Sequence, residues 1–293
     1  MFKQMLANMA SFGDSRRKTP NTKEEKIGIL MGAIYFEENH RLSEAEEIYA
    51  EEYDEEYVPN YGDDFENWPA ECKDYFRDEL SEYFGCLDMD LSGDEYVTAS
   101  KELLEEAWGI VDRESAIKII NWLIDSGHRN YFQFMIRAKK QWGSVTESNF
   151  SVFFESLNEL FCDPIMLPEN VLASAWFNEQ DSESLEGYVD HLNRQIEFAS
   201  ENVNVDIFAW DAARAVQVVR LSFLSGYLID EECWEIVRRN YKIHEQSFKN
   251  WFQFSESFLL GRLFWSCEED EGLTQASERL LSHKLSPWKF CQK

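Results

Sequence analysis

The stretch Ala209-Trp-Asp-Ala-Ala-Arg-Ala-Val-Gln-Val-Val-Arg220 has the clearest structural pattern in this sequence. Its alanines and valines recur with the spacing of an α-helix, and the pattern stops at Gly226-Tyr227. Residues 230–232 are acidic and begin a second helical pattern, because acidic side chains favour the positive end of a helix dipole. A third pattern covers about residues 247–265. The stretch and its neighbours therefore predict three consecutive helices.

The helical pattern also appears upstream of this stretch. Residues 27–35 form one apolar helical face, and Asp112 is the predicted N-cap of a helix that ends at Gly127. No stretch sustains the alternation of a strand, and glycine and proline are few, at 13 and 6 residues. We predict an all-α protein, a single multi-helix globular domain of about ten helices with an acidic N-terminal helical portion.

Composition divides the chain into four parts. Residues 1–24 form a polar lead that can be flexible, and residues 25–100 form the acidic helical portion. Residues 101–265 form the helical body, and residues 266–293 form a C-terminal tail. The division follows changes in charge and apolar pattern along one chain of 293 residues, a length that allows one large domain.

Negative charge dominates the composition. The chain has 56 Asp and Glu residues against 28 Lys and Arg, a formal net charge of −28. Such a charge argues against a nucleic-acid-binding protein, because contact with phosphates needs a basic surface. An aromatic content of 15% argues equally against a disordered acidic tail, since so many aromatic side chains need a core.

Most of the excess charge lies between Glu44 and Glu95, which we call the acidic belt; it has 20 acidic and two basic residues, with aromatic residues interleaved. One interpretation is a solvated face whose aromatic side chains pack on the body. The other is a docking surface for a basic protein partner, because aromatic residues are enriched in interface cores. The candidate binding residues are Glu51, Glu52, Tyr53, Asp54, Glu55, Glu56 and Tyr57.

The cysteines and the hydropathy pattern indicate the compartment. The six cysteines lie at least 14 residues apart, which excludes close zinc-binding pairs and is typical of free thiols in a reducing cytoplasm. A loop over residues 88–94 begins like a calcium site, but Ala99 occupies the position of its closing Glu ligand. No run of 18 apolar residues occurs. We predict a cytoplasmic protein with no metal, no cofactor, no membrane association and no direct nucleic-acid partner.

Four short motifs occur in a fixed order. They are Ala107-Trp-Gly-Ile-Val-Asp-Arg-Glu-Ser115, Trp122-Leu-Ile-Asp-Ser-Gly-His-Arg129, Ala209-Trp-Asp-Ala-Ala-Arg214 and Leu259-Leu-Gly-Arg-Leu-Phe-Trp265. Together they resemble the bacterial family of unknown function to which the YbeU and YbeR proteins belong. The resemblance covers about residues 75–265 and implies a cytoplasmic bacterial protein with a mostly helical domain. It implies no established activity.

Charged residues within these motifs form a second candidate site. A His and an Arg follow Gly127 at a predicted helix end, where they can cap backbone carbonyls. A His in such a place can also be catalytic, because small changes in environment move its pKa across neutral pH. The group as a whole is interpreted either as an internal ion-pair network or as an anion-binding cleft. Its members are His128, Arg129, Asp211, Arg214, Arg220 and Arg262.

The sequence contains no nucleophile elbow, P-loop, dinucleotide fingerprint, zinc-protease motif or kinase motif. We therefore assign no catalytic residue. The leading hypothesis is a non-catalytic interaction protein that binds a basic protein partner, for example an immunity protein that neutralises a toxin. Two alternatives stay open: an enzyme or anion-binding module that uses the His/Arg group, and an adaptor or client of a chaperone system.

Overall fold

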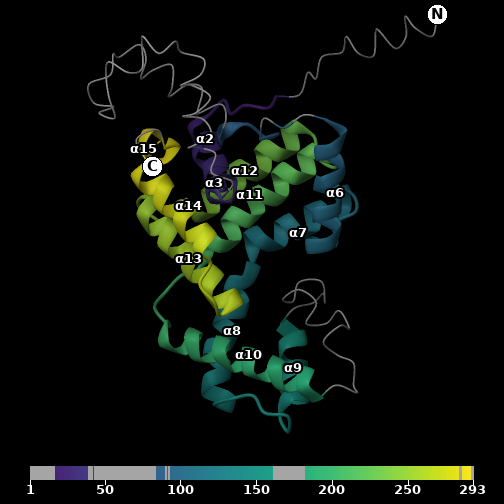
Figure 1. Ribbon diagram of the computed structural model, residues 1–293, viewed down its shortest axis with the longest axis vertical. Coiled ribbons are helices and arrows are strands. Elements are labelled where there is room, and N and C mark those ends of the chain that lie inside the picture. The colour runs from purple at the N-terminus through teal and green to yellow at the C-terminus, as the bar shows by residue number, and fades with distance from the viewer. Residues whose placement is uncertain are drawn as a thin grey trace, which may run out of the picture.

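A computed structural model of the chain describes residues 17–38, 42, 84–89, 91, 93–160, 182–283 and 286–291. Among these residues it contains twelve α-helices and no β-strand, so the predicted all-α fold is confirmed (Figure 1). The helices are α2 (Lys23–Leu30), α3 (Ala33–Glu37), α6 (Asp94–Trp108), α7 (Arg113–Asp125), α8 (Gly127–Trp142), α9 (Phe150–Leu160), α10 (Ser182–Glu201), α11 (Phe208–Leu224), α12 (Asp230–His244), α13 (Trp251–Ser266), α14 (Glu271–Ser282) and α15 (Pro287–Phe290).

Helix α11 lies at the centre of the molecule (Figure 1). All but two of its 17 residues are buried, as expected for a helix that other helices surround. Helices α6, α7, α12 and α13 pack around it, and their buried apolar side chains belong to one continuous core. Gly261 permits the close approach of α13, because a Cβ there would lie 2.3 Å from the Cβ of Trp210. The stretch with the clearest sequence pattern is therefore the structural core.

The chain changes direction between α7 and α8. Asp112 caps the start of α7 as predicted, since its carboxylate accepts a hydrogen bond from the N–H of Ser115 at 2.8 Å. Helix α7 ends at Asp125, and Gly127 then adopts the left-handed region with φ +58°. From this break, α8 runs away from the body toward α9 and α10 (Figure 1). We call α8, α9 and α10 the lower lobe.

The first and last described helices pack together. Helix α2 contacts α12, and α3 contacts α14. The indole of Trp288 stacks on that of Trp251, with ring centroids 4.8 Å apart and planes 2° from parallel. Its N–H donates a hydrogen bond to the carbonyl of Leu30 at 3.1 Å. These contacts make α14 and α15, which lie in the predicted tail of residues 266–293, part of the packed body.

The predictions about membrane spans, metal sites, the acidic belt and the cysteines can be compared with the structure only over the described residues. Among the described helices, none combines the length and the apolar character that a membrane span requires. The described portion also contains no group of three or more His, Cys, Asp or Glu side chains placed to hold a metal ion. The candidate residues 51–57 of the acidic belt lie outside the described residues, so their role stays a prediction. The described cysteines are free thiols: Cys86, Cys233, Cys267 and Cys291.

Candidate functional site

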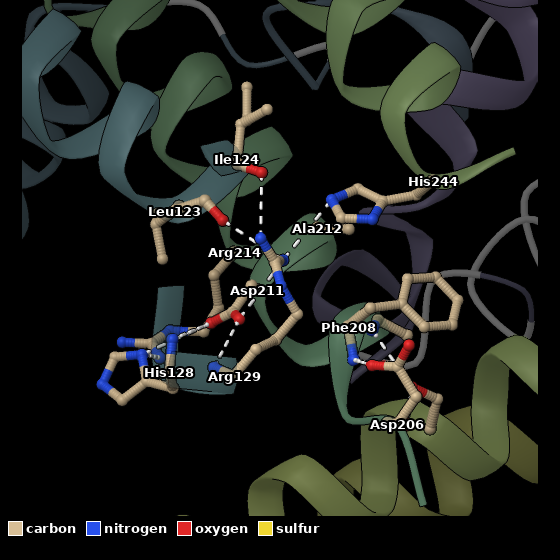
Figure 2. Close-up of polar contacts among 12 residues, drawn as sticks. Leu123, Ile124, His128, Arg129, Asp206, Phe208, Asp211, Ala212, Arg214 and His244 are labelled. Atoms are coloured by element: carbon tan, nitrogen blue, oxygen red, sulfur yellow. Dashed lines mark hydrogen bonds and ion pairs between the residues drawn. The ribbon is translucent and has the colours of Figure 1, made fainter. Parts of the chain in front are cut away.

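The motifs that are far apart in the sequence meet at the start of α8 (Figure 2). Helix α8 brings a His and an Arg in its first turn, and the buried first half of α11 brings an Asp and an Arg. The last residue of α12 is a His that faces the same place. We call this group the Asp211 network, and its members are His128, Arg129, Asp211, Arg214 and His244.

The carboxylate of Asp211 caps helix α8 from a different helix. Its Oδ1 accepts a hydrogen bond from the backbone N–H of His128 at 2.8 Å, and its Oδ2 accepts one from the N–H of Arg129 at 3.1 Å. Ser126, at the N-cap position, makes no side-chain cap. Gly127 must stay a glycine for two reasons: its φ is positive, and a Cβ would lie 2.2 Å from Oδ2 of Asp211.

Asp211 is ionised in the fold. Complete burial would by itself raise its pKa, but the positive charges of Arg129 and Arg214 hold the pKa below its usual value. The guanidinium of Arg129 adds an ion pair, with Nη1 3.4 Å from Oδ2. The buried carboxylate therefore has both backbone and side-chain partners, as a buried charge requires.

The ring of His128 lies between Asp211 and Arg214. Its Nδ1 is 2.8 Å from Nη1 of Arg214 and 3.4 Å from Oδ1 of Asp211. Because a guanidinium only donates, the shorter contact makes Nδ1 an acceptor and places the proton of the neutral ring on Nε2. Burial and the charge of Arg214 lower the pKa of His128 to about 4, so the ring is neutral at pH 7.

The guanidinium of Arg214 is enclosed by indole rings. Its central carbon lies 4.6 Å from the ring centroid of Trp108 and 4.8 Å from that of Trp210, with Trp265 at 5.9 Å. Such cation–π contacts stabilise a guanidinium that has lost most of its water. Trp265 also packs edge-on against His128, with centroids 4.5 Å apart.

Arg129 ties the end of α7 to the network. Its Nη2 donates to the carbonyl of Ile124 at 2.9 Å and its Nη1 to that of Leu123 at 3.4 Å (Figure 2). The prediction that this residue caps the end of a helix is thus confirmed for Arg129, whereas the ring of His128 faces Arg214 and Asp211 instead. Nη1 also lies 3.5 Å from Nε2 of His244, whose pKa burial and the Arg129 charge lower to about 4.

The other two predicted members of the group lie elsewhere. Arg220 is fully buried further along α11, and its Nη2 donates a hydrogen bond to the carbonyl of Phe84. Among the described residues, Nε and Nη1 have no hydrogen-bond partner, and burial lowers the pKa of Arg220 to about 10. Arg262 is only partly buried and pairs with Asp270, with Nε 3.1 Å from Oδ2. The four basic residues of the predicted anion-binding cleft do not converge on one point. His128 and Arg214 are in contact, and the guanidinium of Arg262 lies 5.9 Å from the ring centroid of Trp210, which also contacts Arg214, whereas Arg220 binds the carbonyl of Phe84.

Sequence reasoning missed several members of the site. Three tryptophans around Arg214 and the buried His244 were not assigned to it. The tryptophans stand in the same motifs as the charged residues, so their position gave a usable signal. A single His at the end of α12 gave none, because its neighbours in the fold are remote in the sequence.

Comparison with known proteins gives this chain a family. The family model described as "Protein of unknown function (DUF1266)" matches residues 103–292, about two thirds of the chain. The chain belongs to the DUF1266 family. The match starts within α6 and includes α14 and α15, so it extends beyond the resemblance seen in the motifs.

A curated relative is the uncharacterized protein YbeR of Escherichia coli strain K12. It is 23% identical over 177 residues, which cover 60% of this chain and 63% of YbeR. The chain thus spans less than two thirds of the length of that relative. No solved structure matches the chain significantly.

In this DUF1266 chain, the carboxylate of Asp211 and Nδ1 of His128 are bound by neighbouring groups of the protein. Both carboxylate oxygens accept bonds from α8, and Nδ1 of His128 accepts one from Arg214. A general base needs a lone pair directed at the group that it deprotonates. In this arrangement the lone pairs of Asp211 and of His128 Nδ1 are directed at the protein itself. The network therefore fixes the junction of α7, α8, α11 and α12.

Proposed function

We propose that the protein is a non-catalytic binding protein for a basic protein partner, as an immunity protein is for a toxin. The observation that carries the proposal is its uncompensated negative charge. Carboxylates number 56 and side-chain cations 28, so at least half of the carboxylates have no cation of their own. A basic partner supplies the missing cations, and the field of the chain speeds their encounter.

The ion pairs among the described residues support this proposal, because many of the arginines pair with carboxylates that hold helices together. Several join elements that are remote in the sequence, and their carboxylates are deeply buried, as at Glu25, Glu37 and Asp211. The arginines that pair with these buried carboxylates are not available to neutralise acidic residues on the outer faces. The arginine–carboxylate pairs are Arg17–Glu25, Arg113–Glu232, Arg129–Asp211, Arg238–Glu25, Arg239–Asp125, Arg262–Asp270 and Arg279–Glu37.

An enzyme or anion-binding module has less support from the geometry. Such a site would need basic side chains that converge on open space. Arg262 pairs with Asp270 at the start of α14, and Arg220 points its Nη2 at a backbone carbonyl. The groups that do converge bind one another.

The proposal is tested with a partner captured from the native host and then purified. We expect a basic protein whose association rate falls as salt rises, because ions screen charges over about 8 Å at physiological ionic strength. Changing Glu51, Glu52, Asp54, Glu55 and Glu56 to Gln or Asn should slow association, since long-range charge acts on encounter. Changing Tyr53 and Tyr57 to Ala should speed dissociation, since aromatic residues anchor interfaces. Binding that ignores both salt and these substitutions contradicts the proposal.

A further inference from the structure

Helix α6 has an outer face that the described structure leaves uncovered. Only Ser100 and Leu104 are buried among its 15 residues. The inner side packs on α11, where Trp108 meets Arg214. On the outer side, Tyr96 is 40% exposed and Leu103 is 47% exposed. Figure 1 places α6 at the edge of the molecule, away from the lower lobe.

The outer face combines two rows of side chains. Tyr96, Ala99 and Leu103 follow one another at i, i+3 and i+7, so they form one exposed apolar row. The acidic row lies next to it at i, i+7 and i+11 and consists of Glu95, Glu102 and Glu106, all exposed. Apart from Lys101, α6 contains no basic residue to neutralise these acids. We call the two rows together the α6 face.

We infer that the α6 face binds a basic amphipathic helix of the protein partner, an inference that rests on the proposed function. A helix repeats its side chains with the same period as α6, so it can match both rows along their length. Its apolar side chains would cover Tyr96 and Leu103, and its Lys or Arg side chains would pair with the acidic row. Each row alone is unremarkable on a protein surface, but side by side they specify both the charge and the amphipathic character of the partner.

Charge decides against the other occupants of this face. A second copy of the chain would bring the same acidic row, and like charges placed opposite each other are costly. Nucleic acids and anionic membrane surfaces carry negative charge as well. A basic protein segment is the partner whose chemistry complements the α6 face.

A defined peptide tests the inference without the natural partner. The probe is a fluorescent helical peptide of Leu, Lys and Ala, with leucines in one row and lysines in the adjacent row. A scrambled peptide of the same composition keeps the charge but loses the rows. We expect the wild-type chain to bind the amphipathic peptide about tenfold more tightly than the scrambled one, as measured by fluorescence anisotropy at fixed salt.

The first pair of variants tests the acidic row. Changing Glu95, Glu102 and Glu106 to Gln should weaken binding about tenfold, since three exposed ion pairs each contribute modestly. The matched control changes three exposed acidic residues in the lower lobe and in the connection between α8 and α9, and it should weaken binding less than twofold. The control substitutions are Glu147→Gln, Glu155→Gln and Asp190→Asn.

The second pair of variants tests the apolar row. Tyr96→Ser with Leu103→Ser should remove most of the preference for the amphipathic peptide over the scrambled one. The matched control, Val152→Ser with Val203→Ser, changes side chains that are 56% and 47% exposed in other parts of the molecule and should keep the preference. Circular dichroism of each variant shows that the fold is retained.

The outcomes separate this inference from the proposed function. Equal affinity for the two peptides, or equal effects of the α6 variants and their controls, overturns the α6 face as the docking site. If substitutions at residues 51–56 weaken the peptide complex while the α6 variants do not, the proposed function stands and the α6 assignment falls. If salt and all acidic substitutions leave binding unchanged, both are wrong.

Discussion

The substitution Asp211→Asn removes the charge of the buried carboxylate while keeping its shape. An Asn can accept one of the two hydrogen bonds from α8, but its NH2 group then faces the second N–H, donor against donor. The ion pair with Arg129 is lost as well. Breaking a buried pair costs about 3–5 kcal/mol. Because Arg129 keeps its bonds to two carbonyls, we expect the lower end, a loss of about 3 kcal/mol in the free energy of unfolding.

Urea titration at pH 7, followed by circular dichroism and tryptophan fluorescence, measures this loss. The matched control is Asp206→Asn, which changes an exposed carboxylate whose Oδ1 accepts the N–H of Phe208 at 2.9 Å (Figure 2). Asn accepts such a bond from the N–H two residues on as readily as Asp does, so the control should cost less than about 1 kcal/mol. Equal losses for the two variants would refute the reasoning that the Asp211 carboxylate holds the junction.

Three further predictions concern stability. His128 and His244 each have a pKa of about 4 in the fold but near 6.5 in the unfolded chain. Between these values the unfolded chain binds more protons, so stability falls as pH drops from 6.5 toward 4. His244→Phe should reduce the loss between about pH 6.5 and 5 by about 1.5 kcal/mol in urea titrations. Arg262→Ala should lower the free energy of unfolding by only about 1 kcal/mol, because its ion pair with Asp270 is partly exposed. The change is measured as a small shift in melting temperature. A loss of about 3 kcal/mol or more would mean that the pair behaves as a buried one. Gly127→Ala should lower the free energy of unfolding by on the order of 3 kcal/mol or more, because the new Cβ would clash with the Asp211 carboxylate and the backbone φ is positive. A melting temperature equal to that of the wild type would contradict the close approach of Gly127 to Asp211.

Local patterns predicted what depends on neighbours in the sequence. The capping of α7 by Asp112 and the formation of helix α11 follow from residue types within one or two turns, and both are found in the structure. The motifs also identified four of the five residues of the Asp211 network. These successes share a cause: helix periodicity and capping are properties of short segments.

Remote contacts could not be predicted in this way. Asp211 accepts the backbone N–H of His128, 83 residues earlier in the sequence, and nothing near either residue indicates that the two meet. Arg220 lies six residues after Arg214 on α11, so the helix itself turns the two side chains apart. What the sequence could not indicate are their partners: the carbonyl of Phe84 for Arg220, and Asp270 for Arg262. A basic residue in a motif therefore predicts a buried or paired cation, but its partner is set by the packing of helices.

Hydrogen exchange with and without the purified basic partner tests the central claim most directly. The claim is that the acidic outer surface binds and that the Asp211 network only supports the fold. The predicted result is slower exchange of the backbone amides of α6, residues 94–108, at saturating partner, with unchanged exchange over residues 127–130 and 209–214. Protection of residues 127–130 and 209–214 with no change in α6 would contradict the claim and make the Asp211 network the binding site.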